Sequence, residues 1–133
     1  AAILNYKLKS YNKVIERRRE IAQMYQERLG LLEQLQLPPA PEIDSNNFDV
    51  YQNYELQADN RDGLKDFLNQ NNIGSLIQWG GKGIHHFKKL GFNHVLPNTD
   101  KFFNRCIMIP MNIFISESDI DYICDKITDF YKE

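Results

Sequence analysis

The chain has 133 residues, of which 42% are hydrophobic and 26% are charged, as is typical of a single globular domain with its own core. Its formal net charge of −2 argues against a general nucleic-acid binder, which would normally carry a basic excess. No apolar run is long enough for a membrane-spanning helix. The two cysteines, Cys106 and Cys124, lie in apolar patterns outside any CxxC or Cys/His cluster, which indicates buried thiols in a reducing compartment.

Residues 1–30 predict one long helix. Apolar or small side chains recur along one face from Leu4 to Leu29, at the three- and four-residue steps of a helix, and Gly30 can end it. The chain starts in helical register without a capping residue, and such a helix is long for a small domain. We therefore expect an inter-domain helix and a chain that is a fragment of a longer protein.

Residues 31–47 are predicted to be a linker, because three prolines interrupt any regular pattern at Pro38, Pro39 and Pro41. The remaining residues, 48–133, are predicted to form the folded core. They alternate strand and helix signals along the chain. This order predicts an α/β (α+β) domain of two layers, in which helices cover one face of a small sheet.

Within this core, strands are predicted from Phe48 to Leu56 by apolar alternation, and for residues 73–79 and 106–109. Helices are predicted for residues 61–71, 84–90 and 98–104, with Asn60 as the cap of the first. Ser116 and Asp119 have the spacing of a capping box at the start of the last helix.

A glycine-rich loop after residue 77 carries the side chains with the most functional chemistry. Gly80 and Gly81 permit backbone conformations closed to other residues, and N–H groups in such a loop can bind an anion such as a phosphate. Lys82 can supply a counter-charge, and Trp79 can stack on a base or a sugar. The spacing is not that of a P-loop, and a tight turn with an exposed lysine is the alternative interpretation.

The histidines that follow the loop do not predict a metal site. His85 and His86 are neighbours on a predicted helix, so their side chains are expected to point about 100° apart. Either one of them contacts a ligand or both pack as ordinary histidines. A lysine such as Lys82 can form an imine with pyridoxal phosphate (PLP). The sequence, however, identifies no acidic partner for the pyridine nitrogen of PLP and no complete set of donors for its phosphate. On its residues alone, the chain does not carry the parts of a complete enzyme.

Four stretches, in order, resemble the C-terminal part of the DegT/DnrJ/EryC1/StrS family, which are sugar aminotransferases of PLP fold type I. They are the AAIL…KLK and IERRREIA run, the FDVYQNY strand, the NRD…NNIG segment and the closing IPM segment with its helix, at residues 1–22, 48–54, 60–74 and 109–123. The loop departs from the family's more usual HYxxPxH motif, and His85 matches the second histidine of that motif. The Gln-Trp-Gly-Gly-Lys variant resembles a subgroup that acts on dTDP-4-keto-6-deoxyglucose.

The resemblance implies that residues 1–133 are the C-terminal small domain of a fold type I PLP transferase, without the large domain that carries the imine lysine. It implies a cytoplasmic, homodimeric transaminase that moves an amino group from glutamate through PLP to a nucleotide-linked keto sugar, in lipopolysaccharide or O-antigen biosynthesis. No catalytic residue, metal, nucleic acid or membrane is expected for these residues, and the chain alone is expected to be inactive. The substrate-binding residues it implies are Gln78, Trp79, Gly80, Gly81, Lys82 and His85.

Two other functions are compatible with the sequence. The glycine-rich turn is compatible with a stand-alone module that binds a nucleotide or a sugar phosphate. The long first helix is compatible with a structural partner that docks through this helix. An upstream PLP-binding domain in the same gene would favour the aminotransferase over both.

Overall fold

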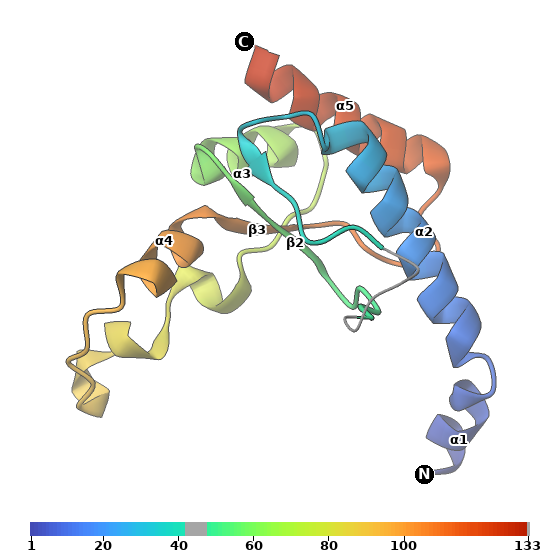
Figure 1. The fold of residues 1–133 in the computed structure, drawn as a ribbon, viewed down its shortest axis with the longest axis horizontal. Coiled ribbons are helices and arrows are strands. Elements are labelled where there is room, and N and C mark those ends of the chain that lie inside the picture. The colour runs from blue at the N-terminus through green and yellow to red at the C-terminus, as the bar shows by residue number, and fades with distance from the viewer. Residues whose placement is uncertain (42–47, 133) are drawn as a thin grey trace.

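The computed structural model describes residues 1–41 and 48–132 (Figure 1). This part of the chain contains five α-helices and a three-stranded antiparallel sheet of order β1-β2-β3. No helix in it is both long and apolar enough to cross a membrane. The elements in chain order are α1 (Ala2–Leu8), α2 (Tyr11–Leu29), β1 (Leu35–Gln36), β2 (Tyr54–Ala58), α3 (Arg61–Gln70), three short 3-10 turns (Gln78–Gly81, Ile84–His86, Lys88–Leu90), α4 (Pro97–Arg105), β3 (Cys106–Ile109) and α5 (Glu117–Lys132).

The core lies between one face of the sheet and the helices α2, α3 and α5. Side chains of β2 alternate, so that Tyr54, Leu56 and Ala58 are buried on this face while the two residues between them are partly exposed. In the register of the antiparallel pair, Leu56 lies opposite Ile107 of β3. The helices contribute buried apolar residues to the same cluster. The predicted two-layer α+β domain is therefore confirmed.

The predicted first helix is interrupted. α1 ends at Leu8 and α2 begins at Tyr11, and between them the Ser10 hydroxyl donates to the Lys7 carbonyl at 3.3 Å. α1 buries no residue, whereas the C-terminal half of α2 is packed in the core. An apolar stripe without a packing surface does not hold a helix straight, because most helical stability in proteins comes from tertiary contacts. Gly30 ends α2 as predicted, and a Cβ there would lie 2.5 Å from the Gln26 carbonyl oxygen.

Two predicted strands differ from the structure. The first begins only at Tyr54, because Tyr51 adopts a left-handed φ of 46° that breaks the extended chain before it. The segment 73–79 forms only a single bridge, in which the backbones of Leu76 and Met108 exchange two hydrogen bonds. The chain then turns at Gln78. β1 was not predicted, and part of the predicted linker, 42–47, lies outside the described residues.

The helices of the second half are close to their predicted bounds. α3, α4 and α5 and the strand β3 all form where they were expected, although Asn60 starts α3 in a left-handed conformation without a side-chain cap. The capping box of α5 is confirmed, since the Ser116 N–H donates to Asp119 and the Asp119 N–H donates to the Ser116 hydroxyl, both at 3.1 Å. The predicted helix 84–90 is instead two 3-10 turns. Both cysteines are buried and free, as predicted.

Candidate functional site

The glycine-rich loop begins an arm that projects from the sheet. After the bridge at Leu76, the loop, the two following 3-10 turns and α4 extend away from the core before β3 returns to it (Figure 1). In this view the arm reaches to the lower left and α1 to the lower right. The candidate site is therefore built on a segment that shares little of the core's packing.

Three successive residues of the loop adopt left-handed conformations. Trp79 has a φ of 54°, Gly80 of 62° and Gly81 of 70°. Glycine takes this region at no steric cost, but an aromatic residue there is strained. Such strain persists where the surroundings impose it, and it concentrates at functional sites. Here it leaves Trp79 76% exposed at the head of the arm.

Three backbone N–H groups in and directly after the loop are engaged in hydrogen bonds within the protein. The Gly80 N–H donates to the Ile77 carbonyl at 3.2 Å, and the Lys82 N–H donates to the Trp79 carbonyl at 3.3 Å. The Gly83 N–H donates to His86 Nδ1 at 3.0 Å. An anion at this loop would therefore meet the Lys82 ammonium group rather than these three N–H groups.

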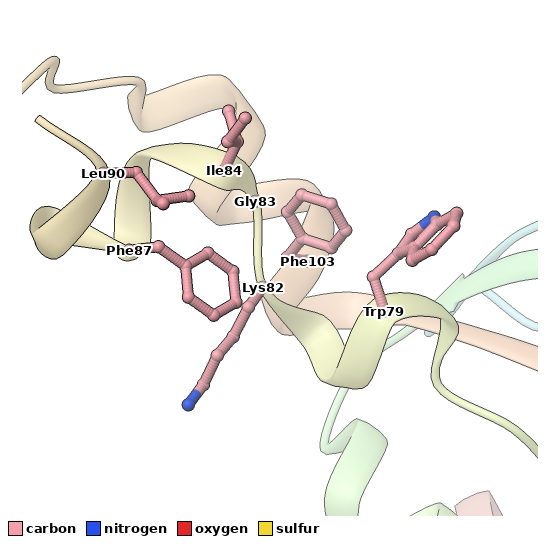
Figure 2. Close-up of a pocket in the computed structure, with 7 residues that line it drawn as sticks. All are labelled: Trp79, Lys82, Gly83, Ile84, Phe87, Leu90 and Phe103. Carbon is pink, nitrogen blue, oxygen red and sulfur yellow. The ribbon is translucent and has the colours of Figure 1, made fainter. Parts of the chain in front are cut away.

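A pocket of about 450 Å³ lies beside the loop (Figure 2). This volume is within the usual range for small-molecule sites, and its walls are mainly apolar and aromatic. Figure 2 shows the Lys82 chain running beside Phe87 with its amino group outward, while Trp79 stands at the other end of the group, beyond Phe103. The lining residues are Trp79, Lys82, Gly83, Ile84, Phe87, Leu90 and Phe103.

A hydrogen-bonded cluster lies next to the pocket, outside its lining. Nε2 of His85 and Nε2 of His86 both lie 2.7 Å from Oδ1 of Asp100 in α4, and their ring centroids are 4.0 Å apart. The expectation that the two imidazoles diverge is wrong, because the tight turn and the shared acceptor bring them together. The hydrogen bond from His85, with a smaller contribution from His86, lowers the pKa of Asp100. These three residues offer ligand atoms within 4.8 Å of one another, so the geometry permits a cation there.

Arg61 ties the arm to the rest of the molecule. Its Nη1 donates to the carbonyls of Phe103 at 3.1 Å and Cys106 at 3.0 Å, which are the end of α4 and the start of β3. Its Nε donates to Asp62 at 2.7 Å. A Cβ on Gly81 would lie 3.8 Å from Nη1, so the loop passes directly over this guanidinium group.

The structure brings some of the predicted site residues together and separates others. Trp79 and Lys82 both line the pocket, whereas His85 is buried, with its ring nitrogen directed to Asp100. Gln78, Gly80 and Gly81 shape the turn between the sheet and the pocket.

The sequence reasoning missed Asp100, Arg61 and Phe103. Asp100 carries only the signal of a first-turn acid in a helix, and nothing local to Arg61 predicts its long-range carbonyl partners.

The described residues do not form a site that fits PLP. An imine lysine needs an enclosed pocket with an acid for the pyridine nitrogen and donors for the phosphate. Lys82 is exposed, none of the residues that line its pocket is acidic, and the N–H groups of Gly80, Lys82 and Gly83 are already engaged. No chemical step through this cofactor is therefore assigned to Lys82.

Residues 1–128 match the model of the DegT/DnrJ/EryC1/StrS aminotransferase family. A curated relative, the "Pleiotropic regulatory protein" of Geobacillus stearothermophilus, is 28% identical over 99% of this chain and 36% of its own length. A solved DegT DnrJ EryC1 StrS aminotransferase from Brucella abortus is 29% identical, with a TM-score of 0.83 over 99% of this chain and 35% of its own.

DesV of S. venezuelae, solved in complex with a ketimine intermediate, has the same fold, with a TM-score of 0.88 at 18% identity over 99% of this chain and 36% of its own. The chain thus spans about a third of the length of these relatives. With a family match that extends over nearly all of its residues, the chain belongs to the DegT/DnrJ/EryC1/StrS aminotransferase family.

Proposed function

We propose that this chain is the small, substrate-covering part of a PLP-dependent aminotransferase that acts on a nucleotide-linked keto sugar. The family match over residues 1–128 and the likeness to a third of each aminotransferase relative support this function. The observation that carries the site is the pairing of an exposed aromatic ring, Trp79, with an exposed cation, Lys82, around one pocket.

The cofactor belongs to residues outside this chain. PLP, when bound, supplies the carbonyl group through which an amino group passes from glutamate to the keto sugar. The residues described here would contribute binding and orientation of the sugar nucleotide and exclusion of water from the cleft. Taken alone, residues 1–133 would neither bind PLP nor transfer an amino group.

Each loop residue has a role that follows from its chemistry. Lys82 forms no ion pair among the described residues, so its ammonium group is available to the anionic diphosphate of a sugar nucleotide. The Trp79 face can stack on the base or the sugar. Gln78 offers an amide donor and acceptor to sugar hydroxyls, and the left-handed glycines, Gly80 and Gly81, let the substrate approach the backbone closely.

The finer assignments are part of the same proposal. dTDP-4-keto-6-deoxyglucose is the substrate we favour, on the likeness of residues 78–82 to the subgroup that aminates it. The full-length enzyme would be a cytoplasmic homodimer in lipopolysaccharide or O-antigen biosynthesis. Sedimentation of the full-length protein tests the dimer.

The two half-reactions of the full-length protein test the site. Trp79→Ala and Lys82→Met should each lower kcat/KM for the keto sugar about tenfold or more, because base stacking and a phosphate contact are each worth roughly 1–3 kcal/mol. The glutamate half-reaction, followed by the cofactor's absorbance, should change less than about twofold, since glutamate lacks both groups that these residues would bind.

Lys132→Met is the matched control, because this exposed lysine lies in the last turn of α5, away from the pocket. It should leave both half-reactions unchanged. Equal losses in the two half-reactions of the Trp79 and Lys82 variants would count against a sugar-side role. Transaminase activity from residues 1–133 alone would overturn the proposal that PLP is bound by residues outside this chain.

A further inference from the structure

The cluster of His85, His86 and Asp100 joins α4 to the turn that directly follows the loop with Trp79 and Lys82. We propose that it is a positioning clamp in which Asp100 receives an N–H from each imidazole and His86 in turn receives the Gly83 N–H, so that the loop is held at a fixed place relative to α4. The hydrogen-bond arrangement stands on geometry alone. Its consequence for sugar binding rests on the proposed function.

The proton positions follow from the partners of each nitrogen. A neutral imidazole has one N–H and one lone pair. His86 Nδ1 faces the Gly83 N–H at 3.0 Å, so Nδ1 must be the acceptor and the proton must be on Nε2. That Nε2–H points at the Asp100 carboxylate, 2.7 Å away. Both nitrogens are engaged, so a flipped ring would lose two hydrogen bonds.

Asp100 is suited to accept both imidazoles. One carboxylate oxygen has two lone pairs, and Oδ1 lies 2.7 Å from Nε2 of each histidine. Donation by the histidines favours the ionised carboxylate, in keeping with the lowered pKa of Asp100. An asparagine would keep one acceptor oxygen but not the charge, which makes Asp100→Asn a graded variant.

Gly83 connects the clamp to the pocket, because it is hydrogen-bonded to His86 and also lines the pocket. Its backbone is buried against the cluster, and a Cβ there would lie 2.7 Å from Cε1 of His85 and 3.1 Å from Cε2 of Phe103. Gly83 follows Lys82 directly and lines the pocket with it. Fixing the Gly83 N–H on His86 therefore fixes the backbone from which the Lys82 side chain extends.

The same atoms argue against a metal as the occupant of the cluster. A divalent ion such as Zn²⁺ at His86 Nε2 needs the lone pair on that nitrogen and the proton on Nδ1. That proton would point at the Gly83 N–H, donor against donor. The arrangement thus favours hydrogen bonds, and metal binding becomes an outcome that would overturn the clamp.

The tautomers can be observed directly in the full-length protein. Long-range ¹⁵N–¹H correlation spectra of protein labelled in histidine, with signals assigned by their loss in His85→Gln and His86→Gln, should show the Nε2–H form for both residues. His94, which is exposed, should show the mixed tautomers of a free imidazole. A Nδ1–H form at His86, or retention of Zn²⁺ with shifts of both signals, would overturn the proposal.

Enzyme kinetics test the consequence for sugar binding. The variant is Asp100→Ala, and Asp66→Asn, at an exposed position of α3, is the matched control. Asp100→Ala should raise KM for the keto sugar nucleotide about fivefold or more, with kcat for the glutamate half-reaction within about twofold. Asp100→Asn should lie between the alanine variant and the wild type. The control should change neither constant.

If Asp100→Ala loses the Nε2–H signals of both histidines but keeps its KM for the sugar nucleotide, the positioning role is overturned while the proposed function remains intact. Failure of the proposed function would instead appear as unchanged sugar use in Trp79→Ala and Lys82→Met. The melting temperature of each variant, compared with that of Asp66→Asn, separates loss of positioning from loss of folding. If Asp100→Ala does not fold, the KM of Asp100→Asn for the sugar nucleotide decides the question instead.

Discussion

The core and the arm of this domain are held together by different interactions. In the core, residues such as Tyr25, Leu64 and Ile107 are fully buried between the sheet and three helices. In the arm, Ile84 is 59% exposed and Leu90 is 63% exposed, and the backbone is held by left-handed turns and a few polar bonds. Apolar burial therefore determines the stability of the core, while hydrogen-bond geometry determines the shape of the candidate site.

The largest expected effect is a core truncation. Ile107→Ala in β3 removes a fully buried side chain opposite Leu56, which should lower the free energy of unfolding by about 2–5 kcal/mol in urea. Leu90→Ala in the arm, at a half-exposed position, should change it by less than about 0.5 kcal/mol. Similar losses in both variants would break the distinction between the two regions.

A smaller effect is expected from the strained tryptophan. Trp79→Gly and Trp79→Ala both remove the exposed ring, but only glycine takes a φ of 54° without steric cost. The loop should be more stable in the glycine variant by about 1 kcal/mol, which slows exchange of the Lys82 amide hydrogen about fivefold relative to the alanine variant. Equal exchange rates would mean that the left-handed conformation is not imposed by the folded arm.

The smallest expected effect compares two carboxylates with lowered pKa values. Hydrogen bonds from Ser116 lower the pKa of Asp119 at the start of α5, and hydrogen bonds from His85 and His86 lower that of Asp100 in the arm. A lowered pKa in the folded state stabilises above the unfolded value of about 3.9 and ceases to do so as the pH falls through the folded value. Asp119→Asn should therefore reduce global stability at neutral pH and converge with the wild type in acid.

Asp100→Asn should leave global unfolding unchanged across the same pH range, because we expect the weakly packed arm to open before the core does. Denaturant titrations at a series of pH values measure both variants, and Asp125→Asn on the exposed side of α5 is the control. A pH-dependent loss of global stability in Asp100→Asn would show that the arm and the core unfold as one unit.

Sequence patterns predicted the core better than the arm, for a physical reason. α5 was predicted because its apolar stripe and capping box are local signals. The segment 73–79 was wrongly predicted as a strand, because a short apolar run does not reveal that only Leu76 finds a partner. The interruption of the helix after Leu8 was missed because an apolar stripe does not reveal whether a packing surface exists.

The candidate site was predicted only in part. Trp79 and Lys82 were identified because their residue types carry recognisable chemistry next to glycines. Asp100 was missed because its partner His85 lies 15 residues away, and Arg61 because it binds a carbonyl 42 residues away. The divergence expected of His85 and His86 assumed a regular helix, which the tight turn replaces.

The bridge between Leu76 and Met108 has a consequence for which substitutions the loop tolerates. The two residues are joined through main-chain atoms, and the Leu76 side chain is left mostly in solvent. The hydrogen bonds of this bridge do not depend on the Leu76 side chain, so we expect changes in the residues that follow it to leave the pairing of β2 with β3 intact. The sequence of the loop can therefore change while the sheet that carries it keeps its pairing.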